Sequence, residues 1–279
     1  MSISIKNETE IQSMRVAGKL AGEVLDYLGD FIKPGITTLE IDQLAHDYMV
    51  GVQGTIPASL NYAPPGSKPF PASLCTSINH QVCHGIPNKK PLKNGDIINL
   101  DVTPIKDGWH GDTSRMYIVG EGSIAAKRLC QICHEAMWVG IDMVRPGMHL
   151  GDIGHAIQAY SERNGYSVVR EFCGHGLGIG FHEEPQVLHY GQPGTREVLQ
   201  AGMTFTIEPM LNIGKKEIKM APNDPLEWEV VTKDRSLSAQ WEHSILVTES
   251  GYEVLTFSTG AVPPPDFVKH FVPNKLVTL

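Results

Sequence analysis

The sequence contains no long hydrophobic run and no surplus of basic residues. None of its apolar stretches reaches the roughly 18 residues of a membrane-spanning helix, so we expect no membrane partner. Lys and Arg number 23 against 31 Asp and Glu, a formal net charge of −8, which argues against a nucleic-acid-binding protein. The segment Met1 to Glu10 lacks the basic-then-apolar pattern of an export signal, so we expect a cytoplasmic location.

Cysteine is scarce. The five cysteines are an odd number and do not predict a disulfide framework. Cys130 and Cys133 precede His134 in a C-x-x-C-H pattern, the pattern of haem attachment. That attachment requires export, and the pattern falls inside an expected helix, so we do not expect haem. A chain of 279 residues can bury a large core without crosslinks, and its length allows two domains or one large one. We expect a single domain spanning residues 1–279.

Apolar periodicity predicts two long helices, from Ile11 to Ile32 and from Ser123 to Val144. A turn containing Pro and Gly ends each of them. Thr37 and Glu40 then form a capping box, which predicts a second helix reaching about Val50. Strands are expected in the stretches that follow: Leu74–Ile78, Asp96–Pro104, Trp109–Val119 and Tyr166–Glu171.

The sequence repeats part of itself. The segment after Pro34-Gly35 resembles the segment after Pro146-Gly147, and the strand-like segment ending at Asp101 resembles the one ending at Glu208. The two matches occur in the same order and at similar offsets. They predict two related halves, about 1–122 and 123–279, each made of two helices followed by strands. Both copies end a strand on a carboxylate.

Asp101 and Asp112 flank a hairpin turn signal at Asp107-Gly108. If these two residues form the loop, Asp112 faces Thr103, which lies on the same face of the strand as Asp101. The two carboxylates then become diagonal neighbours, with backbones roughly 7–8 Å apart. A solvated hairpin face would explain two aspartates alone, whereas two buried like charges at this distance require a cation between them.

Three later motifs add further ligand-type side chains. His175 lies among glycines, and Glu208 and Glu242 lie at or beside strand-like stretches. Buried carboxylates are costly without a partner. Four carboxylates with one imidazole form a mostly oxygen site, which suits Mn, Fe(II), Co or Zn. Bridging carboxylates would indicate a two-metal site for hydrolysis.

The ordered set of these motifs resembles the type I methionine aminopeptidases of the short bacterial kind. The resemblance runs from Ile3 to about Thr256 and includes the segments Val82–Pro87, Phe181–Pro185 and Ser236–His243. It implies an α/β (α+β) fold of the pita-bread type, with two pseudo-symmetric halves around an antiparallel sheet. It also implies two divalent metal ions (Co, Mn, Fe(II) or Zn) held by Asp101, Asp112, His175, Glu208 and Glu242.

The resemblance further implies a monomeric hydrolase that removes the initiator methionine from new polypeptides at the ribosome when the second residue is small. Glu208 would act as general base, His182 would stabilise the carbonyl oxygen, and His84 would meet the amide nitrogen. The implied methionine pocket consists of Tyr62, Phe70, Cys75, Phe181 and Trp228. The proline-rich loop 63–72 is longer than in close relatives, and the sequence does not indicate its role.

Two alternatives use the same fold. One is an Xaa-Pro aminopeptidase or prolidase-like hydrolase, but such proteins usually carry a sizeable N-terminal domain, and this chain enters its catalytic region almost at once. The other is a non-catalytic binding protein, but such proteins usually lose metal ligands, and all the implied ligands are present. The remaining histidines, His189 among them, are expected to be structural.

Overall fold

The computed structural model describes residues 2–258. Its first half contains α1 (Glu8–Gly29), α2 (Thr38–Asp47), a π-helical turn (Tyr48–Gln53), β1 (Ile56–Pro57), β2 (Leu74–Ile78), β3 (Gln81–Cys83), β4 (Ile97–Val102), β5 (Pro104–Lys106), β6 (Trp109–His110) and β7 (Thr113–Ile118). Its second half contains α3 (Ile124–Ile141), α4 (Leu150–Arg163), β8 (Ser167–Val168), β9 (Gly174–Gly176), β10 (Glu183–Val187), β11 (Thr204–Ile207), β12 (Met210–Asn212), β13 (Ile218–Met220), β14 (Val230–Thr232), β15 (Ser238–Gln240), β16 (His243–Val247) and β17 (Tyr252–Val254).

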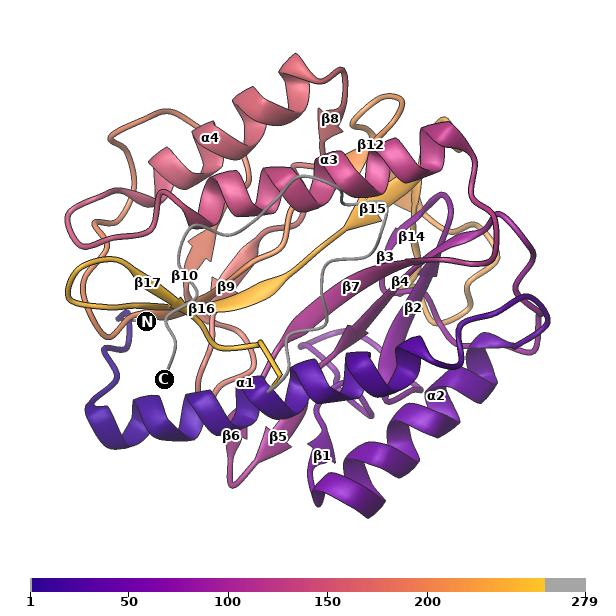
Figure 1. The fold of residues 1–279 in the computed structure, drawn as a ribbon, viewed down its shortest axis with the longest axis horizontal. Helices are drawn as coiled ribbons and strands as arrows, with labels where there is room; N and C mark the ends of the chain where they lie inside the picture. Colours follow the sequence, from indigo (N-terminus) through magenta and orange to yellow (C-terminus); the bar gives the residue numbers. More distant parts are fainter. Residues whose placement is uncertain (1, 259–279) are drawn as a thin grey trace.

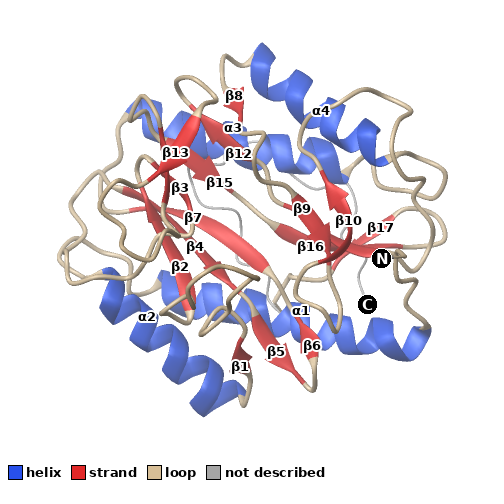
Figure 2. Ribbon diagram, turned by 180° about the vertical axis from the view of Figure 1, so that it is seen from behind, coloured by secondary structure: helices blue, strands red, loops and turns tan. Residues whose placement is uncertain are grey.

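Two helix pairs enclose the strands. In Figure 1, α1 and α2 lie on one side of the molecule and α3 and α4 on the other, with the strands between them. Figure 2 shows the molecule from behind, with strands and loops in front of α1 and α3. The helices therefore cover one face of the sheets, and loops lie over the other. The strand pairs in the described part of the chain are antiparallel. No described helix is long and apolar enough to cross a bilayer.

The predicted helices are present, but their ends differ from the prediction. Helix α1 begins before the predicted Ile11 because Asn7 supplies an N-terminal capping box, and it ends at Gly29 rather than at Ile32. Its side chain accepts the Glu10 N–H at 3.1 Å, and the Glu10 carboxylate accepts the Asn7 N–H at 2.8 Å. The capping box at Thr37 is confirmed, although the helix it opens changes to a π-helical turn after Asp47.

The predicted internal repeat is confirmed by equivalent hydrogen bonds. Gly35 N–H donates to the Leu92 carbonyl at 2.8 Å, and Gly147 N–H donates to the Leu199 carbonyl at 2.9 Å. In both halves, the chain before the second helix is therefore tied to the chain before the carboxylate-bearing strand. That strand is β4 in the first half and β11 in the second, and each has an antiparallel partner, β7 and β16.

The predicted hairpin register around Asp107-Gly108 is also confirmed. Ile105 pairs with His110, and Thr103 Oγ1 donates to Asp112 Oδ1 at 2.8 Å. The strand predicted over Trp109–Val119 is interrupted at Gly111 and Asp112, which separate β6 from β7. A Cβ atom at Gly111 would lie 2.0 Å from the Ala17 carbonyl oxygen, so helix α1 approaches the backbone closely here. The strand predicted over Tyr166–Glu171 is shorter and is limited to β8.

Two large apolar clusters form most of the core. Leu25, Ile41 and Leu100 are fully buried in the first, which joins α1, α2 and β4. Ile153 of α4 and Phe205 of β11 are fully buried in the second, which also includes Ile97 and Met116 from the first half. Burial of side chains of this size stabilises the fold by about 1.5–3 kcal/mol each. The two clusters fix the strands of both halves and so fix the carboxylates that these strands carry.

Short hydrogen bonds join the two halves at their centre. Ser114 and Glu242 form an antiparallel bridge. Thr113 Oγ1 donates to the Glu242 carbonyl at 2.7 Å, and Ser244 Oγ donates to the Asp112 carbonyl at 2.6 Å. Two of the predicted ligands therefore lie where the halves meet.

Candidate active site

A cavity of about 250 Å³ opens between the two halves. It brings together every site residue that the sequence predicted. The ligand-type residues that line it are Asp101, Asp112, His175, Glu208 and Glu242. The other predicted residues that line it are Tyr62, Phe70, Cys75, His84, Phe181, His182 and Trp228.

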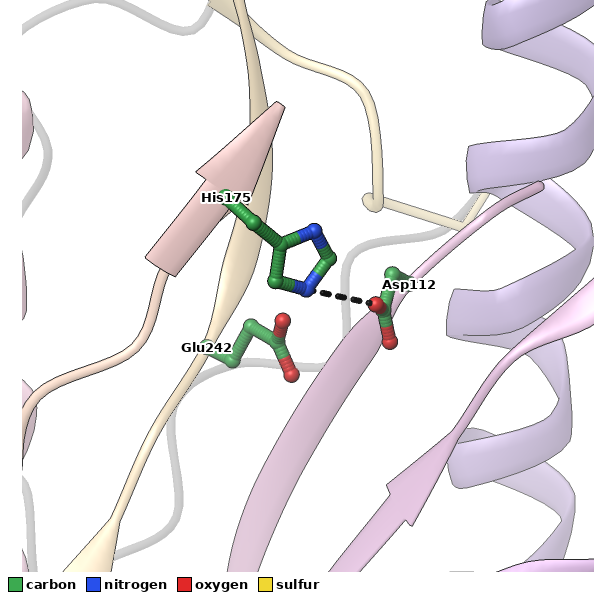
Figure 3. A group of neighbouring side chains, drawn as sticks. All are labelled: Asp112, His175 and Glu242. Carbon is green, nitrogen blue, oxygen red and sulfur yellow. Dashed lines mark ion pairs between the residues drawn. The ribbon is translucent and has the colours of Figure 1, made fainter. Parts of the chain in front are cut away.

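The five ligand-type side chains come from five separate segments. Asp101 lies on β4, Asp112 between β6 and β7, His175 on β9, Glu208 directly after β11, and Glu242 between β15 and β16. Ligand atoms of Asp112, His175 and Glu242 all lie within 4.8 Å of one another, and Figure 3 shows these side chains pointing toward a common centre. Glu208 extends the group, since its Oε1 lies 3.6 Å from His175 Nε2.

The site concentrates carboxylates in a volume shielded from water. Asp112, Glu208 and Glu242 are 3%, 8% and 2% exposed. Burial and the neighbouring carboxylates hold the pKa values of all three well above the ordinary range, and burial raises the pKa of Asp101 to about 7. Burial lowers the pKa of His175 to about 3, so its imidazole is neutral and can act as a ligand.

No lysine or arginine in the described residues forms an ion pair with these four carboxylates. Carboxyl groups buried this close together are stable only when they are protonated, and therefore neutral, or when a cation lies among them. Oxygen ligands with one imidazole fit a divalent metal of the Mn, Fe(II), Co or Zn type. The donor set and its charge therefore fit a metal centre.

Residues outside the predicted set hold Glu208 in place. Thr206 Oγ1 donates to its Oε1 at 2.7 Å, and Gln240 Nε2 donates to its Oε2 at 3.1 Å. The backbone N–H of Glu208 donates to Nε2 of the buried His189 at 3.1 Å. Sequence reasoning missed these contacts. The only signal was that Thr206 lies two positions before Glu208, on the same side of an extended chain.

His84 occupies a strained backbone position beside the ligands. Its φ of 56° lies in the left-handed region, which is uncommon for a residue with a Cβ. The ring stands edge-on between Phe172 and Trp228, with centroid distances of 5.4 and 5.6 Å. Burial lowers the pKa of His84 to about 4, so the ring is neutral at pH 7 and can donate one hydrogen bond and accept another.

His182 lies at the edge of the cavity, and its ring is held by two aromatic neighbours. Phe181 stacks on it at a centroid distance of 4.2 Å, and the Tyr62 hydroxyl lies 2.8 Å from its Nδ1. The neighbouring groups exclude water from part of the ring and lower its pKa to about 4. A neutral imidazole at this position can still donate one hydrogen bond into the cavity.

The remaining predicted pocket residues form an apolar wall. Phe70 is 2% exposed and meets Trp228 edge-on at 5.4 Å. Cys75 packs in the same cluster, and burial raises the pKa of its thiol well above the ordinary value, so it stays uncharged. An apolar wall containing a sulfur atom suits a thioether side chain.

Two sequence patterns lie apart from this site. Cys130 and Cys133 are fully buried within α3, and the Cys133 thiol donates to the Pro209 carbonyl at 3.3 Å. Burial raises the pKa of Cys130 to about 12, which keeps its thiol protonated. The segment from His182 to Gln186 enters strand β10, so its histidine and glutamates do not form a helical zinc motif.

Comparison with known proteins gives consistent matches over most of the chain. Residues 12–249 match the model of metallopeptidase family M24. The chain is 52% identical to a methionine aminopeptidase of Rickettsia prowazekii over 96% of this chain and 100% of the relative, and 55% identical to one of Escherichia coli over 92% and 94%. A crystal structure of methionine aminopeptidase from R. prowazekii superimposes with a TM-score of 0.88, at 53% identity, covering 92% of this chain and all of that one.

A prolidase structure from Pyrococcus furiosus is more distant. Its TM-score is 0.72 at 21% identity, covering 91% of this chain and 66% of that one. The likeness extends to the fold and no further.

Proposed function

Because the chain belongs to metallopeptidase family M24, and matches methionine aminopeptidases at more than half identity over nearly their whole length, we infer that it is a methionine aminopeptidase. It hydrolyses the peptide bond after an N-terminal methionine when the second residue is small. The observation that carries this conclusion is the cluster of buried carboxylates and His175 beside an apolar, sulfur-containing pocket.

The substrates are the N-termini of newly made polypeptides, because these carry the initiator methionine. We place the reaction in the cytoplasm, at or near the ribosome, and propose that the protein acts as a monomer. We also propose that residues 1–279 form a single catalytic domain. The hydrogen bonds between Asp112 and Ser244, and between Thr113 and Glu242, support one domain because they tie the halves together at the site.

We propose that five side chains hold two divalent metal ions. Asp112 and Glu242 come from opposite halves and meet at the centre of the site, where both would hold the ions. Asp101 would add a further carboxylate ligand. His175 and Glu208 would also be ligands, since His175 Nε2 lies 3.5 Å from Asp112 Oδ2 and 3.6 Å from Glu208 Oε1. When bound, such ions supply an activated water molecule and polarise the scissile carbonyl.

The chain's own residues would bind, orient and move protons around that centre. Glu208 is the proposed general base, and Thr206 and Gln240 orient its two oxygens. The ring of His182, oriented by Tyr62, would donate a hydrogen bond to the carbonyl oxygen as it gains negative charge. His84, held between two rings, would contact the substrate amide nitrogen.

The methionine side chain would occupy the wall formed by Tyr62, Phe70, Cys75, Phe181 and Trp228. These rings contact one another: Tyr62 meets Phe181 edge-on at 5.1 Å and lies 6.3 Å from Trp228. Their mutual packing gives a preformed apolar surface, which reduces the entropy lost when a flexible thioether chain binds.

The decisive experiment compares cleavage of Met-Ala-Ser with cleavage of Ala-Pro-Ala by purified protein. We expect strong preference for Met-Ala-Ser, chelation to abolish its cleavage, and Mn, Co or Fe(II) to restore it. Preference for Ala-Pro-Ala would support the Xaa-Pro alternative, and inactivity on both peptides with every metal would support a binding protein. Full activity after exhaustive metal removal would contradict the metal centre itself.

A further inference from the structure

The proline-rich loop that the sequence left unexplained is a closed structure next to the methionine pocket. Its two ends are paired, because Phe70 N–H donates to the Tyr62 carbonyl at 2.8 Å and Asn61 N–H donates to the Phe70 carbonyl at 2.9 Å. Both ends therefore carry a pocket residue, Tyr62 or Phe70. The intervening residues 63–69 are mostly exposed.

Lys68 makes two contacts from this loop to a second loop, residues 221–229. The Trp228 indole N–H donates to the Lys68 backbone carbonyl at 2.9 Å. The Lys68 ammonium donates to the Pro225 carbonyl at 2.5 Å. One residue thus contacts both the backbone and the pocket side chain of the opposite loop.

The second loop has its own brace, which makes it a fixed partner. Asp224 accepts the backbone N–H groups of Leu226 and Glu229, both at 2.8 Å, and also that of Trp228. These bonds to the charged carboxylate hold the pKa of Asp224 below its ordinary value, although burial opposes them. The backbone of Trp228 is therefore set by its own loop, and the direction of its indole N–H is set by Lys68.

The orientation of Trp228 matters because its ring contacts three site residues. It stands edge-on to Phe70 and to His84, at interplanar angles of 83° and 88°, and it lies beside Tyr62. The backbone of Trp228 also hydrogen-bonds the His84 ring. A rotation of the indole would change the width of the methionine pocket. It would also change the edge-on contact that Trp228 makes with the His84 ring.

We propose that Lys68 is a positioning residue that latches loop 61–70 to loop 221–229 and thereby fixes Trp228 as a wall of the methionine pocket. The latch comprises the Lys68 carbonyl, the Lys68 ammonium, the Trp228 indole N–H and the Pro225 carbonyl. The arrangement gives the proline-rich loop a function, because Lys68 reaches from it across to Pro225. The consequence for catalysis rests on the proposed function, whereas the latch itself does not.

The test uses Lys68→Met, which keeps the aliphatic stem and the backbone carbonyl but removes the ammonium. We expect KM for Met-Ala-Ser to rise about fivefold, the scale of one net hydrogen bond, while kcat changes less than about twofold. Lys68→Arg should keep KM close to the wild-type value, because the guanidinium can also donate a hydrogen bond to a carbonyl. Lys33→Met, at an exposed lysine just before Pro34, serves as the matched control and should leave both constants unchanged.

Trp228→Phe removes the other donor of the latch. If the two contacts act as one unit, the double variant Lys68→Met/Trp228→Phe should have about the KM of the more impaired single variant. The effects of substitutions that remove a shared interaction do not add. An unchanged KM in Lys68→Met, a fall in kcat alone, or independent multiplication of the two effects would overturn the proposal.

A second measurement separates the latch from the proposed function. Hydrogen exchange of the Trp228 indole N–H, followed by NMR, should be slow in the wild-type protein and in Lys68→Arg and faster in Lys68→Met. Equal exchange in all three proteins would overturn the latch, even if the wild type cleaves Met-Ala-Ser. Protection that depends on Lys68, in a protein that does not cleave the peptide, would support the latch and contradict only the activity.

Discussion

Glu208 shows how a single residue can combine burial, proximity to like charges and specific hydrogen bonds. Its pKa is raised by burial and by Asp112, while Thr206 and Gln240 act in the opposite direction by stabilising the carboxylate. The same two hydrogen bonds hold both carboxylate oxygens in fixed positions, as a group that must accept a proton requires.

Replacing Glu208 by Gln should lower kcat for Met-Ala-Ser by about 100-fold or more, because the amide cannot accept the proton that the carboxylate accepts. The isosteric side chain keeps the shape of the site, so the melting temperature should stay close to that of the wild type. Glu184→Gln, at an exposed glutamate two residues after His182, is the matched control. A near-normal kcat at full metal occupancy would exclude Glu208 as the base.

At the scale of elements, the site depends on the close approach of strand β9 to its neighbours β10 and β11, with no side chains between them. The sequence places His175 between two glycines, and the structure shows what each glycine permits. A Cβ at Gly174 would lie 2.3 Å from the Thr206 carbonyl oxygen, and one at Gly176 would lie 2.1 Å from the Glu184 carbonyl oxygen. Strand β9 can carry His175 toward the carboxylates only because both flanking positions are small.

We predict that Gly174→Ala lowers both stability and metal affinity. The added methyl group must push β9 away from β11, and overpacking of this kind typically costs about 1–3 kcal/mol. The displaced His175 would then bind metal more weakly. Thermal unfolding and titration with Mn²⁺ measure the two effects. Gly51→Ala is the control, because a Cβ there meets nothing within 4 Å; equal behaviour of the two variants would contradict the argument.

The elements themselves were largely predictable from local signals. The Asp107-Gly108 turn fixed the register that brings Thr103 opposite Asp112, and the Thr37 capping box fixed the start of α2. The predicted end of α1 was wrong, because the helix stops before the Pro-Gly turn and not at it. Periodicity locates the buried face of a helix well, but hydrogen bonds at the ends decide where it begins and ends.

At the scale of the whole molecule, metal binding, protonation and folding are coupled. Four carboxylates with raised pKa values retain protons in the folded, metal-free protein that the unfolded chain releases. The folded state then binds more protons, so the stability of the metal-free protein falls as pH rises above the ordinary carboxylate pKa of about 4. For Asp101 the loss extends to about pH 7.

We therefore expect the rise in melting temperature on adding Mn²⁺ to grow between about pH 5 and about pH 7. Metal and protons compete for the carboxylates, and this competition weakens as the pH rises. Buried neutral histidines have lowered pKa values and the opposite pH dependence, but they contribute equally with and without metal. Their effect cancels in the difference. Differential scanning calorimetry of chelated and loaded protein measures the shift, and one that shrinks with pH would contradict this coupling.

The sequence by itself determined the chemistry of the site. The spacing around Asp107-Gly108 predicted that Asp101 and Asp112 meet, and the donor types predicted the kind of ion, because both signals are local. The resemblance of the ordered motifs to the methionine aminopeptidases implied the rest of the ligand set. Only the tertiary structure decided how the side chains are held: Thr206, Gln240 and His189 around Glu208, and Lys68 against Trp228. Those contacts join residues from different loops and strands. A local sequence pattern cannot predict them, because folding alone brings these segments within hydrogen-bonding distance.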